Sequence, residues 1–273
     1  MCLIVFAWRA HPGFPLVVAA NRDEFFDRPS AAAQWWDDGS QRLAGRDLQA
    51  GGTWMGISRN GRFAALTNYR DPSEKKPDAP SRGALIAEFL VDATEPADYL
   101  AALMSAAPRY SGFNLLAAQI GAGEERDAMR VMSNRDQGGP RIVSPGIHAL
   151  SNALLDTPWP KVEHARAALR AVLAKSHRTS DELTASLLDV LADRATAPES
   201  ALPNTGLTID RERALSSIFI RMPGYGTRAS TVLIVDAGGR VTFTERRCEP
   251  GLIDEDRRFE FAIEPSPARP PWE

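Results

Sequence analysis

The sequence predicts an α+β fold built from antiparallel strands and two pairs of helices. Short apolar and β-branched runs recur within residues 2–67, 113–150 and 231–263, and helical periodicity appears within residues 82–106 and 159–191. Turn residues join several of the strand runs directly, which favours hairpins. Strand runs separated by helix pairs indicate layers, with helices on the outer faces of stacked sheets.

The first hairpin organises the chain. Two apolar runs flank a segment rich in proline and glycine, His11–Pro15. Counting outward from Gly13 sets Cys2 opposite Asp23 or Glu24, because antiparallel strands pair by constant sums of residue number. The hairpin therefore predicts a thiol beside a charged cluster.

Position 2 gives that thiol a second property. Cysteine is small enough for the initiator methionine to be removed ahead of it, which would leave a free α-amine on Cys2. An amine of pKa ~7.7–8.0 is partly neutral at pH 7 and can take the proton of a thiol of pKa ~8.5. Cys2 is therefore a candidate nucleophile with its own general base. Two ordinary readings stand beside this one, because a lone cysteine also packs in cores and Asn or Asp also closes strands.

A second hairpin is predicted around Asn60-Gly61, a dipeptide typical of two-residue turns. Counting outward sets Asn68 beside Gly52 and Thr53. A backbone N–H freed by glycine and a side-chain amide are suitable donors to an oxyanion.

The remaining elements follow from local patterns. Residues 35–47 read as loop or short strand, in which Trp35 and Trp36 either cover a pocket or fill a core edge. Asp71–Pro80 is rich in proline and charge, which indicates a surface loop able to act as a lid. Ser81 and Ser180 are the predicted N-caps. Further strands are expected at 54–58, 62–67, 113–118, 128–132, 141–143, 147–150, 231–235, 240–244 and 258–263, and helices at 82–92, 96–106, 159–175, 180–191 and 211–217.

Length and charge fit one soluble domain, residues 1–264, followed by a proline-rich tail, residues 265–273. A chain of 273 residues can bury about three quarters of its unfolded surface. The net charge of −3, from 32 basic and 35 acidic residues, argues against a nucleic-acid surface or a polybasic membrane anchor. Small molecules are the expected partners.

Cysteine usage and hydropathy point to the cytoplasm. Cys2 and Cys248 lie far apart in sequence, so neither a disulfide framework nor a zinc site is predicted, and no cofactor is implied. Free thiols favour a reducing compartment. No run approaches the ~18 apolar residues of a transmembrane helix, and no basic residue precedes the first apolar run as in a signal peptide.

Several short motifs resemble one family over residues 2 to about 235, nearly the whole chain. These motifs are Met1-Cys2, Asn21-Arg22-Asp23-Glu24, Gly51-Gly52-Thr53-Trp54, Thr67-Asn68-Tyr69-Arg70, Leu150-Ser151-Asn152 and Gly226-Thr227-Arg228. On them the chain resembles the NRDE family, also called the transport and Golgi organisation protein 2 family. Its members look like N-terminal-nucleophile (Ntn) hydrolases, so the resemblance implies their four-layer αββα sandwich. Eukaryotic relatives are associated with secretory-pathway organisation and with haem or lipid handling.

Among Ntn hydrolases the chain looks most like the cysteine branch, which includes penicillin V acylases and conjugated bile-acid hydrolases. The resemblance implies that Cys2 is nucleophile and base and that Asp23 holds the α-amine. Asn68 and Asn152 would position the amine and form the oxyanion hole, while Arg228 would stabilise charge near the thiolate. The predicted substrate-binding residues are Asn21, Arg22, Thr53 and Trp54.

One departure concerns Arg22 and Asp23. The acylases separate this arginine and aspartate by two residues, whereas here the two are adjacent. Neighbours on a strand point to opposite faces. We therefore expect Asp23 rather than Arg22 to face Cys2, which leaves Arg22 to bind a carboxylate of the substrate or a partner on the side of Glu24.

Two functions of different class remain open. The first is hydrolysis of an amide (C–N) or thioester bond of a small molecule, with Cys2 attacking the carbonyl. The second is a non-catalytic carrier or chaperone that holds a hydrophobic ligand, such as haem or an acyl chain, in the same pocket. For haem, Cys2, His11 or His148 are candidate axial ligands.

Overall fold

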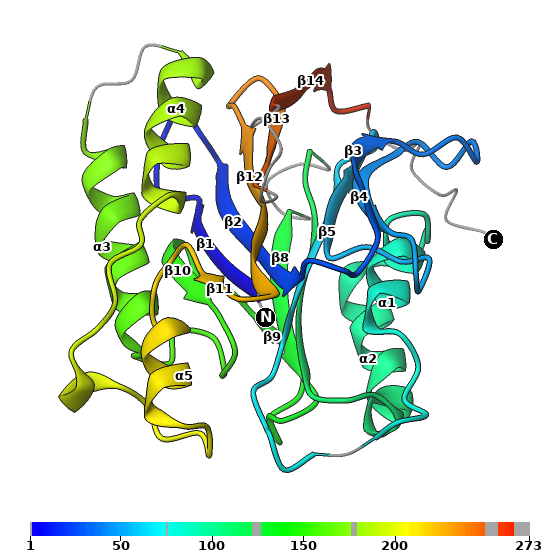
Figure 1. Cartoon of the computed structure of the whole chain (residues 1–273). Coiled ribbons are helices and arrows are strands. Elements are labelled where there is room, and N and C mark those ends of the chain that lie inside the picture. The colour runs from blue at the N-terminus through cyan, green and yellow to red at the C-terminus, as the bar shows by residue number, and fades with distance from the viewer. Residues whose placement is uncertain (1, 75, 122–126, 176–178, 249–255, 265–273) are drawn as a thin grey trace.

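The computed structural model describes residues 2–74, 76–121, 127–175, 179–248 and 256–264. Two seven-stranded antiparallel sheets face each other, and a pair of helices covers the outer face of each (Figure 1). The expected four-layer αββα sandwich is confirmed. Over the described ranges, no helix has the length and apolar character needed to cross a membrane.

The first sheet has the strand order β10-β1-β2-β12-β13-β14, with β11 paired to β12. Its helical cover is α3 (Pro160–Leu173) and α4 (Ser180–Leu191), and α5 (Ile209–Ala214) lies at one end. The strands are β1 (Cys2–Trp8), β2 (Leu16–Phe25), β10 (Gly146–Leu150), β11 (Arg221–Met222), β12 (Tyr225–Val235), β13 (Arg240–Arg247) and β14 (Asp256–Ala262).

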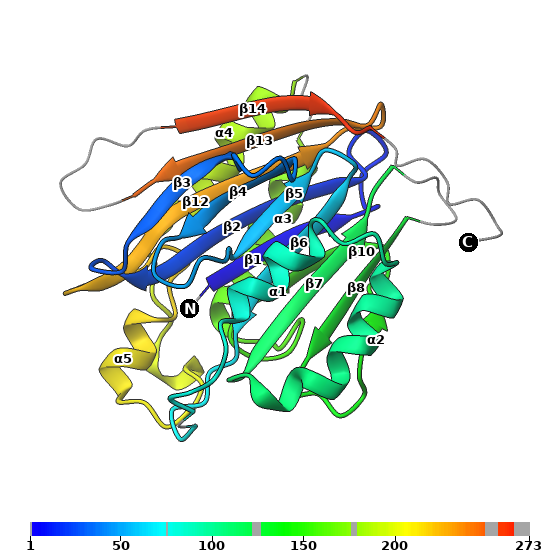
Figure 2. The same ribbon diagram turned by 90° about the vertical axis from the view of Figure 1, so that its right-hand side faces the viewer.

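The second sheet runs β3 through β9 in chain order. Figure 2 looks onto this sheet, with α1 (Arg82–Phe89) and α2 (Pro96–Ala106) in front of it. The strands are β3 (Ser30–Trp35), β4 (Arg42–Asp47), β5 (Met55–Ser58), β6 (Arg62–Asn68), β7 (Phe113–Gln119), β8 (Ala128–Ser133) and β9 (Arg141–Ile142). Short 3-10 turns occupy Ala107–Arg109 and Glu199–Ala201.

Strand β1 is apolar on both faces because both faces are buried. Ile4, Phe6 and Trp8 point into the core between the sheets, whereas Leu3 and Val5 pack against α3 and α4. Cys2 continues the first series, because side chains alternate along a strand. The thiol therefore faces the space between the two sheets.

The register of the first hairpin differs from the prediction. Cys2 pairs with Arg22, not with Asp23 or Glu24, and Trp8 pairs with Leu16. The hairpin is thus centred on Pro12, one residue before Gly13. The second hairpin keeps its predicted register, because Met55 pairs with Ala65.

Several boundaries differ from their predictions for local reasons. Thr179 caps α4, because its hydroxyl accepts the backbone N–H of Glu182 at 3.2 Å, and Ser180 is already helical. Ser81 occupies the N-cap position of α1 but makes no side-chain cap hydrogen bond. Of the segment predicted as loop or short strand, Arg42–Asp47 forms strand β4, which pairs with β3, and residues 36–41 connect the two. Trp35 packs edge-on against Phe261 at 5.0 Å, so it fills a core edge and covers no pocket.

Candidate active site

A cavity of about 500 Å³ opens at the end of the sandwich where β1 begins and where β2, β4 and β6 end. Six of the predicted site residues line it: Cys2, Arg22, Asp23, Thr53, Trp54 and Asn68. Asn21, Asn152 and Arg228 do not belong to its lining. The rest of the wall comes from the ends of β2 and β4 and the residues just after them, from residues 76–83, and from Leu66 and Ser111.

The Cys2 thiol and the Arg22 side chain share one face of the first sheet, because their residues are direct cross-strand partners. The expectation that Asp23 rather than Arg22 faces Cys2 is therefore wrong, and the shift in register is the cause. Burial raises the pKa of the Cys2 thiol, while the backbone N–H of Asp23 and the charge of Arg22 act in the opposite direction. The thiol therefore needs a nearby base to ionise at neutral pH.

Arg22 is held rigidly with one nitrogen uncommitted. Its guanidinium stacks over the Trp54 ring at 4.3 Å, and its Nη2 lies 3.7 Å from Asp47 Oδ2. Its Nη1 is buried and has no hydrogen-bond partner in the described part of the chain. Gly45 makes the stack possible, because a Cβ there would lie 2.3 Å from the Trp54 ring.

The Asp23 carboxylate points to the other face of the sheet, towards α3. Thr227 Oγ1 donates to Asp23 Oδ1 at 2.7 Å, and the Tyr225 hydroxyl donates to the Asp23 backbone carbonyl at 3.1 Å. Burial raises the pKa of Asp23, and the charge of Lys161 opposes this rise. Asp23 therefore lies beside the first residue of β1 and lines the cavity, while its carboxylate bonds Thr227 on the other side.

Asn21 shares the face of Asp23 and is a structural residue. Its Nδ2 donates to the backbone carbonyls of Leu191 and Ile218, each at 2.9 Å, and its Oδ1 accepts from Ser230 Oγ at 2.7 Å. These bonds tie β2 to the end of α4. The predicted substrate-binding position of Asn21 is corrected, because alternation directs its amide away from the cavity.

Asn152 is fully buried and fixes the strand ends that surround Cys2. Its Nδ2 donates to the Asn68 backbone carbonyl at 2.9 Å. The preceding Ser151 hydroxyl donates to the Cys2 backbone carbonyl at 3.2 Å. The Asn152 amide thus joins β10 to β6 and does not reach the cavity wall, contrary to the expected oxyanion role.

Arg228 also lies outside the cavity. A bulge between Thr227 and Ala229 interrupts the pairing of β12 with β2, so strand alternation does not direct Arg228 towards Cys2. Its Nη1 donates to the backbone carbonyl of Phe25, at 3.1 Å, and to that of Arg28. Arg228 holds the turn after β2.

Thr53 has its donors committed to protein groups. Its backbone N–H donates to Gly83 O at 3.1 Å, and its hydroxyl donates to Met55 O at 3.3 Å. A Cβ at Gly52 would lie 2.3 Å from the backbone of Gly83, so the close approach of these two backbone segments requires glycine at position 52. Thr53, which the sequence predicted to bind substrate, thus lines the cavity while its backbone N–H anchors the start of α1.

That anchor brings Arg82 to the cavity, a residue that no motif indicated. Arg82 lines the cavity wall, and its Nη1 donates to Gly112 O at 2.9 Å. Burial lowers the pKa of Arg82, while the charges of Cys2 and Glu24 oppose this. Arg82 therefore adds a second guanidinium within electrostatic range of the thiol.

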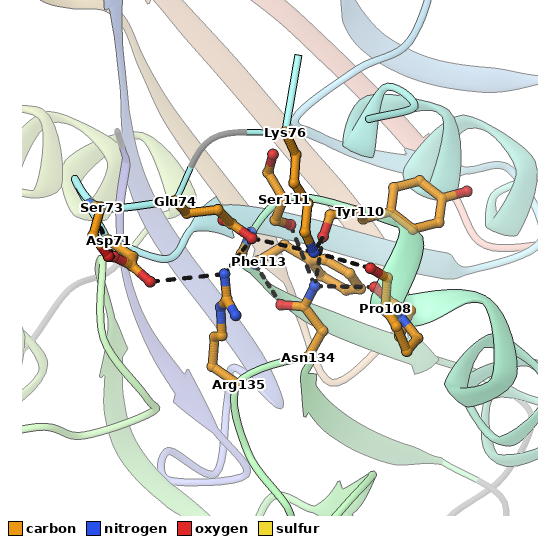
Figure 3. A network of polar contacts seen from close by, with 12 residues as sticks. Asp71, Ser73, Glu74, Lys76, Pro108, Tyr110, Ser111, Phe113, Asn134 and Arg135 are labelled. Atoms are coloured by element: carbon orange, nitrogen blue, oxygen red, sulfur yellow. Dashed lines mark hydrogen bonds and ion pairs between the residues drawn. The ribbon is translucent and has the colours of Figure 1, made fainter. Parts of the chain in front are cut away.

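The described parts of the predicted lid are residues 71–74 and 76–80. The network of Figure 3 holds them to the rest of the protein, and Lys76, Pro77, Ala79 and Pro80 line the cavity. Lys76 Nζ donates to Pro108 O at 2.9 Å and to Tyr110 O at 3.1 Å. Glu74 Oε2 accepts the backbone N–H of Gly112 at 2.8 Å and pairs with Arg135. Arg135, in the turn after β8, thus also anchors this loop.

The histidines considered as haem ligands lie elsewhere. His148 pairs with Phe6, four residues and so about 13 Å along β1 from Cys2. Its ring nitrogens bond Asp156 at 2.7 Å and Ser144 O at 2.9 Å. His11 lines a different cavity. Within the described ranges, no group of three His, Cys, Asp or Glu side chains is arranged to hold a metal ion.

Comparison with solved structures returned hydrolases of low identity. An N-acylethanolamine-hydrolyzing acid amidase ortholog from Caenorhabditis elegans is 12% identical, with a TM-score of 0.48, over 85% of this chain and 92% of that one. A mutant conjugated bile acid hydrolase from Clostridium perfringens is 7% identical, with a TM-score of 0.49, over 98% and 99%.

Sequence relatives are much closer. The bovine Transport and Golgi organization protein 2 homolog is 41% identical over 257 residues, which cover 90% of this chain and 92% of the relative. The human homolog is 38% identical over 281 residues, which cover 97% and 100%. A family model described as Transport and Golgi organisation 2 matches residues 1–250. The chain therefore belongs to the Transport and Golgi organisation 2 family, the family that its motifs resemble.

Proposed function

We propose that this protein is a hydrolase in which Cys2 is the N-terminal nucleophile, and that it cleaves an amide (C–N) or thioester bond of a small molecule carrying an anionic group. The observation that carries the proposal is the placement of Cys2 and Arg22 on one face, in one polar cavity. A buried wall cysteine of a hydrophobic carrier would need no guanidinium beside it.

The chemistry follows from the groups present. With Met1 removed, the α-amine of Cys2 takes the thiol proton, and the thiolate attacks the substrate carbonyl carbon. Collapse of the tetrahedral intermediate breaks the C–N or C–S bond, and the α-ammonium returns its proton to the departing amine or thiol. Water then attacks the Cys2 thioester with the α-amine as base, which releases the acid and the free thiol.

Two donors are available for the oxyanion. Asn68 lines the cavity, and its side-chain amide makes no hydrogen bond to any other described residue. Arg22 Nη1 is the second candidate, since it is buried and unpartnered among those residues. A preorganised donor aimed at developing charge is worth about 2.7–4 kcal/mol in comparable sites.

The anionic group is inferred from the charge of the wall. Four cationic side chains line the cavity, namely Arg22, Arg28, Lys76 and Arg82, against three acidic ones, Asp23, Glu24 and Asp47. Asp47 is shared between Arg22 and Arg28, at 3.7 and 2.7 Å. Guanidinium groups that lack a full protein partner suit a carboxylate or phosphate of the ligand.

The alternative of a carrier for haem or an acyl lipid would use the same cavity without turnover. Trp54, Leu66 and two prolines supply its apolar wall. In that case Cys2→Ala would leave ligand affinity unchanged. A cytoplasmic location belongs to the hydrolase proposal, because a nucleophilic thiol keeps its activity in a reducing compartment.

The experiment is intact-mass analysis of untagged protein with two activated esters, p-nitrophenyl acetate and the monoanionic mono-p-nitrophenyl succinate. We expect loss of Met1, an acyl adduct on the N-terminal peptide, and faster acylation by the anionic ester. Arg22→Met should remove that preference. Arg46→Met is the matched control, because Arg46 also stacks on a tryptophan, at 4.5 Å from the Trp36 ring centre, but lies outside the cavity lining. Retention of Met1, or adducts elsewhere, contradicts the proposal.

A further inference from the structure

Lys161 is a buried cation at an unfavourable place. It is the second residue of α3 and only 2% exposed. Its Nζ makes no hydrogen bond to any residue that the structure describes. A cation near a helix N-terminus is repelled by the helix dipole, and burial of an unpaired ammonium is costly. A lysine kept under these conditions calls for a role.

The charges around Lys161 come from four elements and leave one carboxylate for it. They belong to Asp23 on β2, Cys2 on β1, Arg70 after β6 and Glu212 on α5. Arg70 and Glu212 satisfy each other, because Arg70 Nη1 lies 2.7 Å from Glu212 Oε2. Asp23 is thus the carboxylate whose charge favours the Lys161 cation most.

The charge of Glu24 also acts on Asp23, and it raises the pKa of that carboxyl. Two further neighbours of Asp23 are polar and uncharged at neutral pH. Thr227 Oγ1 donates to its Oδ1. The Tyr225 hydroxyl donates to its backbone carbonyl, and burial raises the pKa of Tyr225, so the phenol stays protonated. One carboxylate therefore serves Lys161 and, in a mature chain, the α-amine of Cys2.

We propose that Lys161 is a positioning residue that shares the Asp23 carboxylate with the α-amine of Cys2 and so keeps that amine in its neutral, proton-accepting form. This inference rests on the proposed function. A second positive charge on the amine would lie near the Lys161 ammonium with a single carboxylate between them, and like charge disfavours protonation. The same repulsion makes the α-ammonium a better acid towards the leaving group.

The Lys161 charge is present at the pH where this matters. Burial lowers the pKa of Lys161 to about 8, with Asp23 acting in the opposite direction. The ammonium therefore predominates at pH 7 and is lost above pH 8. The Lys161 ammonium therefore repels the α-ammonium of Cys2 near pH 7, where the mechanism needs a neutral amine.

The test is the pH dependence of Cys2 acylation by p-nitrophenyl acetate in the full chain. Lys161→Met removes the charge, and we expect the rising limb of the rate profile to move up by about one pH unit. Acylation should then be about tenfold slower at pH 7 and recover at pH 9. Lys161→Arg should keep the limb in place. Lys175→Met, at an exposed lysine just after the same helix, is the control.

The outcomes separate this inference from the proposed function. An unmoved limb in Lys161→Met, with mature Cys2 that still acylates, overturns the role of Lys161 alone. Retained Met1 in the same mass spectrum overturns both. If Lys161→Met does not fold, nitrogen-15 NMR titration of the parent decides, because coupled steps of the α-amine and Lys161 Nζ support the inference and independent titrations overturn it.

Discussion

The two ends of the β-sandwich each hold a cavity, and the larger one is not the site that we propose. The Cys2 end encloses about 500 Å³. The far end encloses about 870 Å³, lined by turn residues such as His11, Pro12 and Asp236. Size alone would select the far end.

The polar groups of the two ends are satisfied differently. At the far end, Asp236 Oδ1 accepts the backbone N–H groups of Gly238 and Arg240, and His11 Nδ1 accepts that of Gly13. At the Cys2 end, Arg22 and Lys161 are buried, and each keeps a nitrogen without a hydrogen bond to any described residue. A buried cation with a nitrogen left without a hydrogen bond marks a functional site better than volume does.

The largest expected effect separates the two ends by activity. Cys2→Ala should reduce acylation by activated esters at least about a thousandfold, because the nucleophile is lost. His11→Ala at the far end should change the rate by less than about twofold, since it removes no reacting group. Stopped-flow release of p-nitrophenol measures both. A comparable loss of acylation rate in His11→Ala would contradict this account, because it would place the chemistry at the far end.

The next effect is on stability. Glu212→Gln leaves Arg70 buried without its counter-charge, and both side chains are at most 5% exposed. We expect a loss of about 3 kcal/mol in the free energy of unfolding, measured by urea denaturation. The exposed pair of Arg213 with Glu199 supplies the control, because Glu199→Gln should cost less than about 1 kcal/mol. Equal losses would show that the pair of Arg70 and Glu212 is not a desolvated one.

Asp23→Asn should act on the α-amine. The amide can still accept from Thr227, but the negative charge is gone, so the pKa of the amine should fall. Acylation should slow about a hundredfold, because the amine is no longer held in position, even though a larger share of it is neutral at pH 7. Titration of the amine in mutant and parent checks the first effect. Identical titration would make Asp23 a strand-end residue only.

The smallest effect lies away from the cavity, at His148. Its hydrogen bond to Asp156 raises the pKa of His148 above the ordinary 6.5. A raised folded-state pKa stabilises below the unfolded pKa, and this contribution is lost as pH rises through the folded value. Asp156→Asn should therefore remove about 1 kcal/mol near pH 5.5 and less at pH 9. A pH-independent loss would contradict the assignment.

The fold could be predicted from the sequence because its signals are local. A helix was predicted at residues 159–175, and its apolar stripe of Val162, Ala165, Leu169 and Val172 packs against the first sheet. The register of the hairpin around Asn60-Gly61 was predicted correctly, although the connection between β5 and β6 has three residues, 59–61, rather than two. Gly61, with φ of 84°, is its last residue. The first turn is longer, and its register was predicted incorrectly. The backbone N–H of Arg9, whose φ is 46°, donates to Pro15 O, so the hairpin is centred on Pro12 rather than on Gly13.

The site was predictable only in part because much of it depends on distant contacts. Cys2 and Arg22 lie on strands whose pairing the sequence indicates. Arg82 arrives through the Gly52–Gly83 contact, and Lys161 through the packing of α3 on the first sheet. No pattern in one sequence reports such contacts. The bulge that diverts Arg228 carries no local signal either.

The most direct measurement compares the two cysteines of one molecule. Cys248 is a built-in control, because it is also half-buried and its Sγ lies 3.7 Å from Ser230 Oγ. After brief exposure to a sub-stoichiometric activated ester at pH 7, peptide mapping should find the acyl group on an N-terminal Cys2, and Cys2→Ala should abolish the fast phase. Acylation of Cys248 first, or equally slow reaction of both thiols, would contradict Cys2 as the nucleophile.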